Sequence, residues 1–154
     1  MTPNYHELFL ALQPEVALVL GALVVLGVDL VAGRRQDLAR RLQTAVTLGL
    51  IALAAAAWCA LHPGVNGPAF GGVLVLDALT LVARLGVTVL AALTLLTLPG
   101  VARVRQPAEY VAIILFATSG FTLMAAAQQL LLAFLALELA SLSLYVLAGF
   151  DKTR

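Results

Sequence analysis

Residues 134–154, FLALELASLSLYVLAGFDKTR, place a single carboxylate, that of Glu138, inside an otherwise apolar run. The run begins at about Leu130 and ends at about Phe150, and at about 1.5 Å per helical residue it can cross a hydrocarbon core about 30 Å thick. Only a helix satisfies its own backbone hydrogen bonds in lipid without closing into a barrel. The stretch therefore predicts a membrane-spanning helix with an acid near its centre.

The rest of the chain has the same apolar character. Of the 154 residues, 62% are apolar and only 11% are charged, with a mean hydropathy of +1.04, whereas soluble domains are about half apolar and a quarter charged. The alternating pattern of barrel strands is absent from the sequence. We expect an all-α integral membrane protein, a single membrane domain over residues 1–154. The expected spans are about 14–32, 42–61, 73–98, 110–127 and 130–150.

Positive charges mark alternate loops. Arginines lie between the first and second spans and between the third and fourth, and Lys152 and Arg154 follow the fifth. The loops HPGVNGPAFGG and AAAQQ contain no Lys or Arg. Because Lys- and Arg-rich loops stay in the cytoplasm, we expect the N-terminus outside and the C-terminus inside.

The same distribution of charge excludes two further features. The N-terminal segment carries no Lys or Arg ahead of its apolar run, so we expect a retained helix rather than a cleaved signal peptide. The net charge is only +1 and the arginines cluster in short loops, which gives no indication of a nucleic-acid partner.

Besides Glu138, we single out three ionisable residues within the spans or at their edges. Asp29, near the inner end of the first span, is expected to reach water or Arg34. Asp77 stands near the outer end of the third span, and Arg84 follows seven residues later, so the two share one helix face about 10 Å apart. We expect a paired Asp77–Arg84 stripe that faces other helices rather than lipid, because an arginine at that depth can only partly reach the surface.

Glu138 is the deepest of these groups, about 12 Å below the outer boundary and too far for a carboxylate to reach water. An acid at a helix centre costs roughly 3 kcal/mol, against a gain of roughly 0.3 to 0.6 for each large apolar residue, so the span can insert despite it. Ser141 and Tyr145 lie within about 60° of Glu138 on the helix. Two interpretations stay open: a carboxyl that exchanges protons along a line of hydroxyls, or a structural acid that hydrogen-bonds across helices.

Cysteine and histidine offer no metal or redox site. Cys59 is the single cysteine, so no intrachain disulfide is possible, and its apolar neighbours favour a packing role. The two histidines fit no metal-ligand spacing. We therefore expect no catalytic residue, no metal and no bound cofactor in this chain.

Three stretches together resemble subunit N of respiratory complex I, the proton-pumping NADH-quinone oxidoreductase. LLLAFLALELASLSLYVLAGF (130–150) is similar to the fifth transmembrane helix of that subunit. LQPEVALVLGALVVLGVDLVAGRR (12–35) is similar to its first helix, and LVLDALTLVARLG (74–86) to its third. The stretches come in the same order as in the family, and the resemblance covers nearly the whole chain.

This resemblance implies an antiporter-like membrane subunit, in which the fifth-helix glutamate is a key charge of the proton pathway. Glu138 matches that glutamate, and it would hold or pass a proton and modulate a lysine on the seventh helix. Ser141, Tyr145, Arg84 and Asp77 are weaker candidates for the same pathway. Arg84 falls where the third helix commonly carries a lysine, a shorter and less permanently charged group.

The resemblance also implies a setting for the chain. The complex passes electrons from NADH to quinone in the bacterial inner membrane, and its flavin, iron–sulfur clusters and NADH site are expected in other subunits. The expected partners are the other membrane subunits and the lipid bilayer, with quinone acting at the level of the complex. The family continues beyond its fifth helix, so we expect this multi-pass chain to be an N-terminal piece that does not conduct protons alone.

Two other readings of the sequence stay open. One is a subunit of a related cation/proton antiporter or membrane-bound hydrogenase, which shares the buried glutamate. The other is a small structural membrane protein in which Glu138 serves only helix packing.

Overall fold

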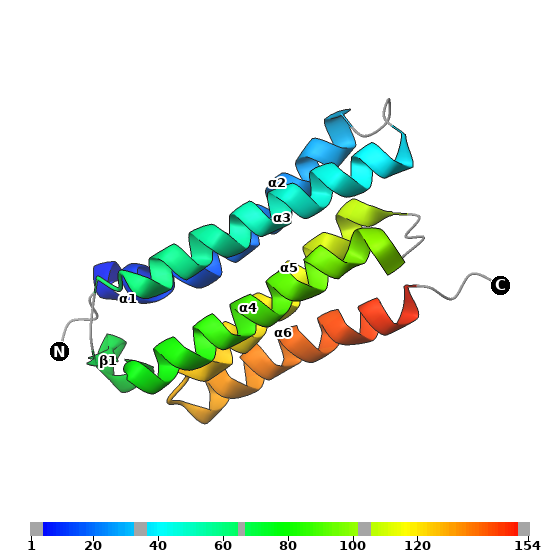
Figure 1. Cartoon of the computed structure of the whole chain (residues 1–154). Helices are drawn as coiled ribbons and strands as arrows, with labels where there is room; N and C mark the ends of the chain where they lie inside the picture. Colours follow the sequence, from blue (N-terminus) through cyan, green and yellow to red (C-terminus); the bar gives the residue numbers. More distant parts are fainter. Residues whose placement is uncertain (1–4, 33–36, 65–66, 102–105, 151–154) are drawn as a thin grey trace.

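A computed structural model of the chain describes residues 5–32, 37–64, 67–101 and 106–150. Long helices run side by side in one bundle, and a short helix and a small hairpin lie at one of its ends (Figure 1). In chain order the elements are α1 (Tyr5–Ala11), α2 (Gln13–Ala32), α3 (Leu38–Leu61), β1 (Gly67–Ala69), the 3-10 turn η2 (Phe70–Gly72), β2 (Leu74–Leu76), α4 (Ala78–Val101), α5 (Pro107–Ala126) and α6 (Leu130–Gly149).

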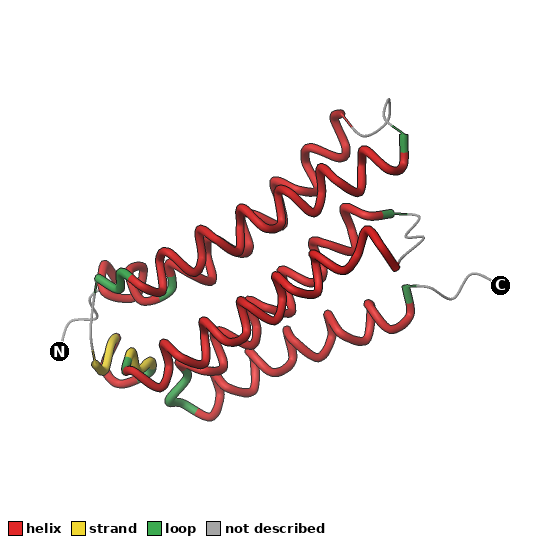
Figure 2. Tube along the Cα trace, in the orientation of Figure 1, coloured by secondary structure: helices red, strands yellow, loops and turns green. Residues whose placement is uncertain are grey.

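The expected all-α membrane architecture is confirmed. Five helices, α2 to α6, are long and apolar enough to cross a membrane, and helix dominates the described chain (Figure 2). The chain reverses direction between successive long helices, so the ends of α2, α4 and α6 lie at the same end of the bundle as the starts of α3 and α5 (Figure 1). The arginine-bearing segments adjoin these helix ends, as the alternating topology requires. Which end faces the cytoplasm stays a prediction, as does the single-domain organisation.

The third span differs from its expected bounds. We expected a helix over 73–98, but α4 begins at Ala78, and Leu74–Leu76 forms a strand instead. The helix also continues past Leu98 through Pro99 to Val101, because a proline in the last turn removes only one helical hydrogen bond. The bounds of the other four spans differ from those expected by four residues or fewer.

The loop HPGVNGPAFGG folds into part of a small antiparallel hairpin, which the sequence analysis did not predict. Strand β1 pairs with β2, with Gly67 opposite Leu76. The turn between them places Gly71 at φ +69° and Gly72 at φ +85°, a backbone region that glycine adopts without steric penalty. The hairpin is tied to the α5–α6 turn by a hydrogen bond from the Gln128 amide to the Val73 carbonyl, 2.9 Å long.

Helix α5 occupies the centre of the bundle. It packs against α2, α3, α4 and α6, and its Val111 and Leu115 side chains are fully buried in the main core. Small and hydroxyl-bearing residues cover much of its remaining surface, among them Thr118, Ser119 and Thr122, all buried. Small residues let membrane helices approach closely, and dispersion contacts rather than a hydrophobic effect then hold them together.

Two glycines lie at close helix contacts. A Cβ atom on Gly120 would lie 2.7 Å from the backbone nitrogen of Ala140 and 2.9 Å from the carbonyl oxygen of Ala136. A Cβ on Gly21 would overlap the side chain of Ala52, joining α2 to α3 in the same way. Gly120 therefore sets the spacing of the α5–α6 pair, since backbone atoms cannot move aside as a flexible side chain can.

Helix α6 is the least covered of the five long helices. It packs mainly on α5, and only Ala136, Ala140 and Ser143 are buried along its length. In Figure 1 it forms one edge of the bundle (orange to red). The face of α6 turned away from α5 is therefore open in the described part of the chain.

Candidate functional site in the membrane

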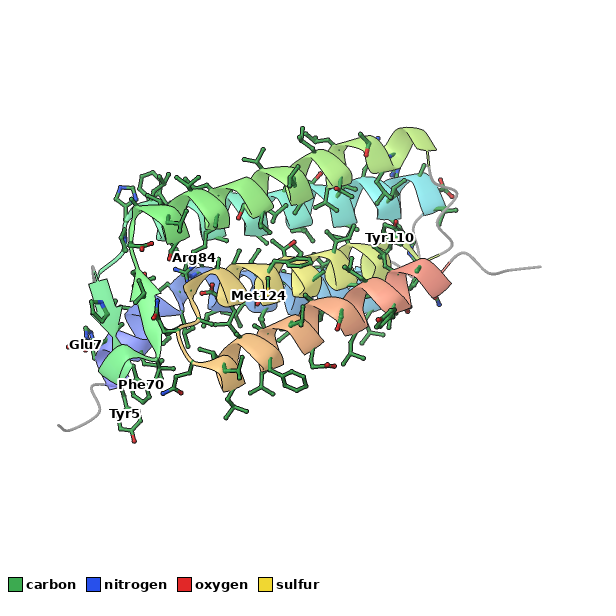
Figure 3. The ribbon with its side chains drawn as sticks, turned by 90° about the horizontal axis from the view of Figure 1, so that it is seen from below. Tyr5, Glu7, Phe70, Arg84, Tyr110 and Met124 are labelled. Carbon is green, nitrogen blue, oxygen red and sulfur yellow. The ribbon has the colours of Figure 1, made fainter. Side chains whose placement is uncertain are left out.

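Arg84 lies inside the bundle and joins three segments of the chain. Its Nη2 atom donates to Oε1 of Glu15 at 2.9 Å and to the carbonyl of Ala11 at 3.2 Å, while Nε donates a longer bond of 3.4 Å to the carbonyl of Thr122. The arginine is 4% exposed, and Figure 3 shows it projecting from α4 into the space between the helices. The expectation that Arg84 faces protein rather than lipid is confirmed.

Glu15 is the partner that the sequence analysis missed. It lies in the first turn of α2, directly after Pro14, and is 6% exposed. Helix dipoles favour acids in a first turn, so such a glutamate is easily taken for an ordinary helix start. The overlooked signal was its position inside the expected first span, where a carboxylate needs a partner.

The Glu15–Arg84 pair is not fully satisfied. The second carboxylate oxygen, Oε2 of Glu15, is the one buried side-chain polar atom among the described residues that lacks a hydrogen-bond partner. Buried charges normally require both pairing and hydrogen bonds. The site therefore has unused hydrogen-bonding capacity next to a membrane-embedded ion pair.

The expected Asp77–Arg84 pairing is wrong. Asp77 directly precedes α4, and its carboxylate accepts a 2.7 Å hydrogen bond from the amide of Thr80, three residues on. This is the geometry of a helix N-cap, which satisfies one of the unpaired amides of the first turn. The bond lowers the pKa of the exposed Asp77 carboxyl. The aspartate is thus held at the helix start, and Arg84 turns instead toward α1, α2 and α5.

Glu138 lies on the open face of α6. It is exposed, and Tyr145, two turns later, is 73% exposed. Ser141 is half-buried and donates its hydroxyl to the backbone carbonyl of Glu138 at 3.2 Å, not to the carboxylate. No hydrogen bond or ion pair joins Glu138 to Arg84 within the described segments. The structure thus places the two membrane charges in separate surroundings, and the proton-pathway role of these residues stays a prediction.

Asp29 finds an arginine, although not the expected one. Its two carboxylate oxygens accept bonds of 2.9 and 2.6 Å from Nε and Nη2 of Arg41 on α3. Such a two-pronged contact matches the planar guanidinium to the carboxylate. Arg34, the expected partner, lies outside the described residues. The Asp29–Arg41 pair therefore clamps α2 to α3 near the arginine-rich end.

The described residues contain no group of three or more His, Cys, Asp or Glu side chains that could hold a metal ion. Cys59 is a free, half-buried cysteine of α3. His62 lies at the end of the same helix, and its ring stacks on Trp58 at a centroid distance of 4.3 Å. The membrane-embedded charges described above are thus the chain's candidate functional groups.

Comparison with curated proteins supplies the family. The chain is 37% identical over 140 residues to NADH-quinone oxidoreductase subunit N of Sphingopyxis alaskensis, a match that covers 91% of the chain and 29% of that protein. It is 35% identical over 160 residues to subunit N 2 of Acidobacterium capsulatum, covering 97% of the chain and 32% of the relative. The chain belongs to the subunit N family.

A shorter match has higher identity: 44% over 89 residues to subunit N 1 of Roseiflexus castenholzii, covering 58% of the chain and 16% of the relative. No model of a known protein family matches the chain. The chain thus spans about a third or less of the length of these subunit N relatives.

Proposed function

We propose that the chain forms part of a membrane subunit of a proton-translocating NADH-quinone oxidoreductase in the bacterial inner membrane. The supporting observation is the match to proteins named subunit N along more than nine tenths of the chain. In this proposal electrons pass from NADH to quinone in other subunits, which hold the flavin and iron–sulfur clusters. This chain holds none of them and contributes to moving protons.

Glu138 is the residue to which we assign the proton-handling role. A carboxylate near the middle of a span costs roughly 3 kcal/mol if it meets lipid, and on α6 it is exposed on a face that the described helices leave open. We infer that polar groups beyond the described residues cover it in the assembled membrane. The relatives are about three times as long as the matched region or longer, so further helices of the same subunit are the proposed cover.

A carboxyl in that position can take up and release a proton, and its charge acts on a nearby basic group. Ser141, Tyr145, Arg84 and Asp77 are secondary candidates. Tyr145 shares the open face with Glu138, whereas Arg84 is paired with Glu15. The other membrane subunits and the bilayer are the proposed partners, and quinone acts at the level of the whole complex.

The proposal is tested with the complex assembled in its own membrane. Glu138→Gln keeps the side-chain shape but cannot exchange a proton, so pumping per NADH oxidised should fall while assembly is maintained. Glu138→Asp should lose less, because the charge survives. Glu109→Gln, at an exposed first-turn position of α5, is the matched control and should pump normally.

A structural glutamate gives the opposite ranking. Gln would then be tolerated because it hydrogen-bonds well, and the shorter Asp would be the defective variant. Normal pumping by Glu138→Gln together with a defect in Glu138→Asp would remove the proton-handling role.

A further inference from the structure

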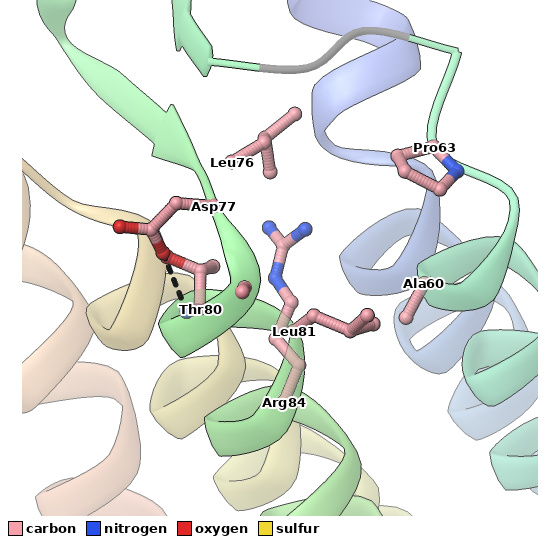
Figure 4. A pocket seen from close by; sticks show the side chains of 8 residues that line it. Ala60, Pro63, Leu76, Asp77, Thr80, Leu81 and Arg84 are labelled. Carbon is pink, nitrogen blue, oxygen red and sulfur yellow. Dashed lines mark hydrogen bonds between the residues drawn. The ribbon is translucent and has the colours of Figure 1, made fainter.

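A pocket of about 400 Å³ lies beside Arg84, at the end of the bundle that carries β1 and β2 (Figure 4). Ala60 and Pro63 line it from the α3 side, and Leu76, Asp77, Thr80 and Leu81 line it from β2 and α4. In Figure 4 the guanidinium of Arg84 points up from α4 into this space. The pocket thus leads from the hairpin end of the bundle to a membrane-embedded charge.

One guanidinium nitrogen remains available to the pocket. Nε and Nη2 of Arg84 donate the bonds to Thr122, Ala11 and Glu15, whereas no bond from Nη1 to another described residue is found. The guanidinium points into the pocket that Arg84 lines, so we assign Nη1 to this space.

The charges around the pocket select the occupant. An anion would satisfy Nη1, but it would lie close to the Glu15 carboxylate that already pairs with Arg84. A cation would meet the guanidinium itself. Water avoids both conflicts, because it has no net charge and accepts from Nη1 with its oxygen.

We propose that this pocket is a hydrated site, in which water bound to Nη1 of Arg84 connects the Glu15–Arg84 pair to the aqueous phase at the hairpin end of the bundle. Liquid water occupies about 30 Å³ per molecule, so several molecules fit in the space. The hydration relieves part of the cost of burying Arg84. It makes Glu15–Arg84 a water-linked ion pair rather than a dry one, independently of whether the complex pumps protons.

Thiol accessibility in membranes carrying the full chain tests the site. In a Cys59→Ala background, Leu81→Cys places a thiol on the pocket lining, and Val82→Cys places one on the neighbouring lipid-facing position, 68% exposed. A charged methanethiosulfonate reagent attacks only a thiolate, which requires water. Leu81→Cys should therefore react at least about tenfold faster than Val82→Cys, and from the side opposite the arginine-rich loops.

Three outcomes would overturn the proposal. Equal rates at the two positions would mean that the pocket is dry. Faster modification of Leu81→Cys from the arginine-rich side would contradict the access route. A preference for the anionic over the cationic reagent, with protection by inorganic phosphate, would identify an anion site instead of a hydrated one.

A second measurement needs no substitution and so avoids any loss of folding. Hydroxyl radicals generated from water by a brief X-ray pulse oxidise side chains that touch water. In the unchanged chain Leu81 should be oxidised and Leu93, a leucine of the same helix that is 54% exposed toward lipid, should not. Oxidation of Leu93 to the same extent as Leu81, or of neither, would count against a hydrated pocket.

Discussion

Replacing Glu15 with Gln breaks the buried ion pair and leaves Arg84 charged among helices. Removing one partner of a buried pair costs about 3–5 kcal/mol, because the other charge stays buried without compensation. We expect the lower end here, about 3 kcal/mol, since Arg84 lines the pocket and two backbone carbonyls still accept its other bonds. Arg84→Met should cost a similar amount, because it leaves the Glu15 carboxylate alone.

The double variant separates pairing from general packing loss. Glu15→Gln with Arg84→Met removes both charges, so its free energy of unfolding should fall by less than the sum of the single changes, with a coupling of about 2 kcal/mol or more. The assay is reversible unfolding of the purified chain in detergent micelles titrated with a denaturing detergent, followed by circular dichroism.

The Asp29–Arg41 pair provides a matched control. Its side chains are 22% and 26% exposed, against 7% and 5% for Glu15 and Arg84. A partly exposed pair contributes at most about 1 kcal/mol, so Asp29→Asn should be mild. A coupling between Glu15 and Arg84 no larger than that between Asp29 and Arg41 would refute the reasoning from burial.

Three further outcomes are expected. Gly120→Ala should destabilise the fold by about 1–3 kcal/mol, because its Cβ would meet the Ala140 backbone. Gly27→Ala is the control and should not destabilise it, because nothing lies within 4 Å of the added Cβ. Equal effects of the two variants in micelle unfolding would disprove the close α5–α6 contact. The bond from the Thr80 amide lowers the pKa of Asp77, so its stabilising contribution should be complete above about pH 4 and be lost as pH falls through the lowered pKa. Asp77→Asn should remove that dependence, and an unchanged pH profile of unfolding would argue against the cap. A reporter fused after Arg154 should be active only in the cytoplasm, and periplasmic activity would invert the topology.

The sequence was sufficient for the membrane helices because their signal is composition over a length set by the bilayer. Runs of about twenty apolar residues have no alternative in lipid, and all five predicted spans correspond to long helices. The hairpin at Gly67–Leu76 was missed because it lies in a short glycine-rich segment, where turn geometry rather than hydropathy determines the structure. Because Leu74–Leu76 forms strand β2, α4 also begins later than the expected third span.

The ion-pair partners were harder to predict than the helices. Asp77 and Arg84 share a sequence spacing that suggests pairing, but helix spacing describes only contacts within one helix. The partner of Arg84 lies 69 residues away in sequence, on another helix, and a single sequence carries no direct signal of that proximity. Arg41 likewise reaches Asp29 across the α2–α3 contact. The exposure of Glu138 was also not predicted, since helix spacing does not tell which face of α6 packs on α5.

The central position of α5 has a consequence for how the protein enters the membrane. Of the five spans α5 is the least apolar and α6 the most. All four other long helices nevertheless pack against α5. When a translocon releases helices one at a time, α5 has the least favourable free energy of transfer into lipid. The short turn and the close contact at Gly120 allow α5 and α6 to partition together as a hairpin. Helix α6, which carries Glu138, then enters the lipid together with α5, the helix at the centre of the bundle.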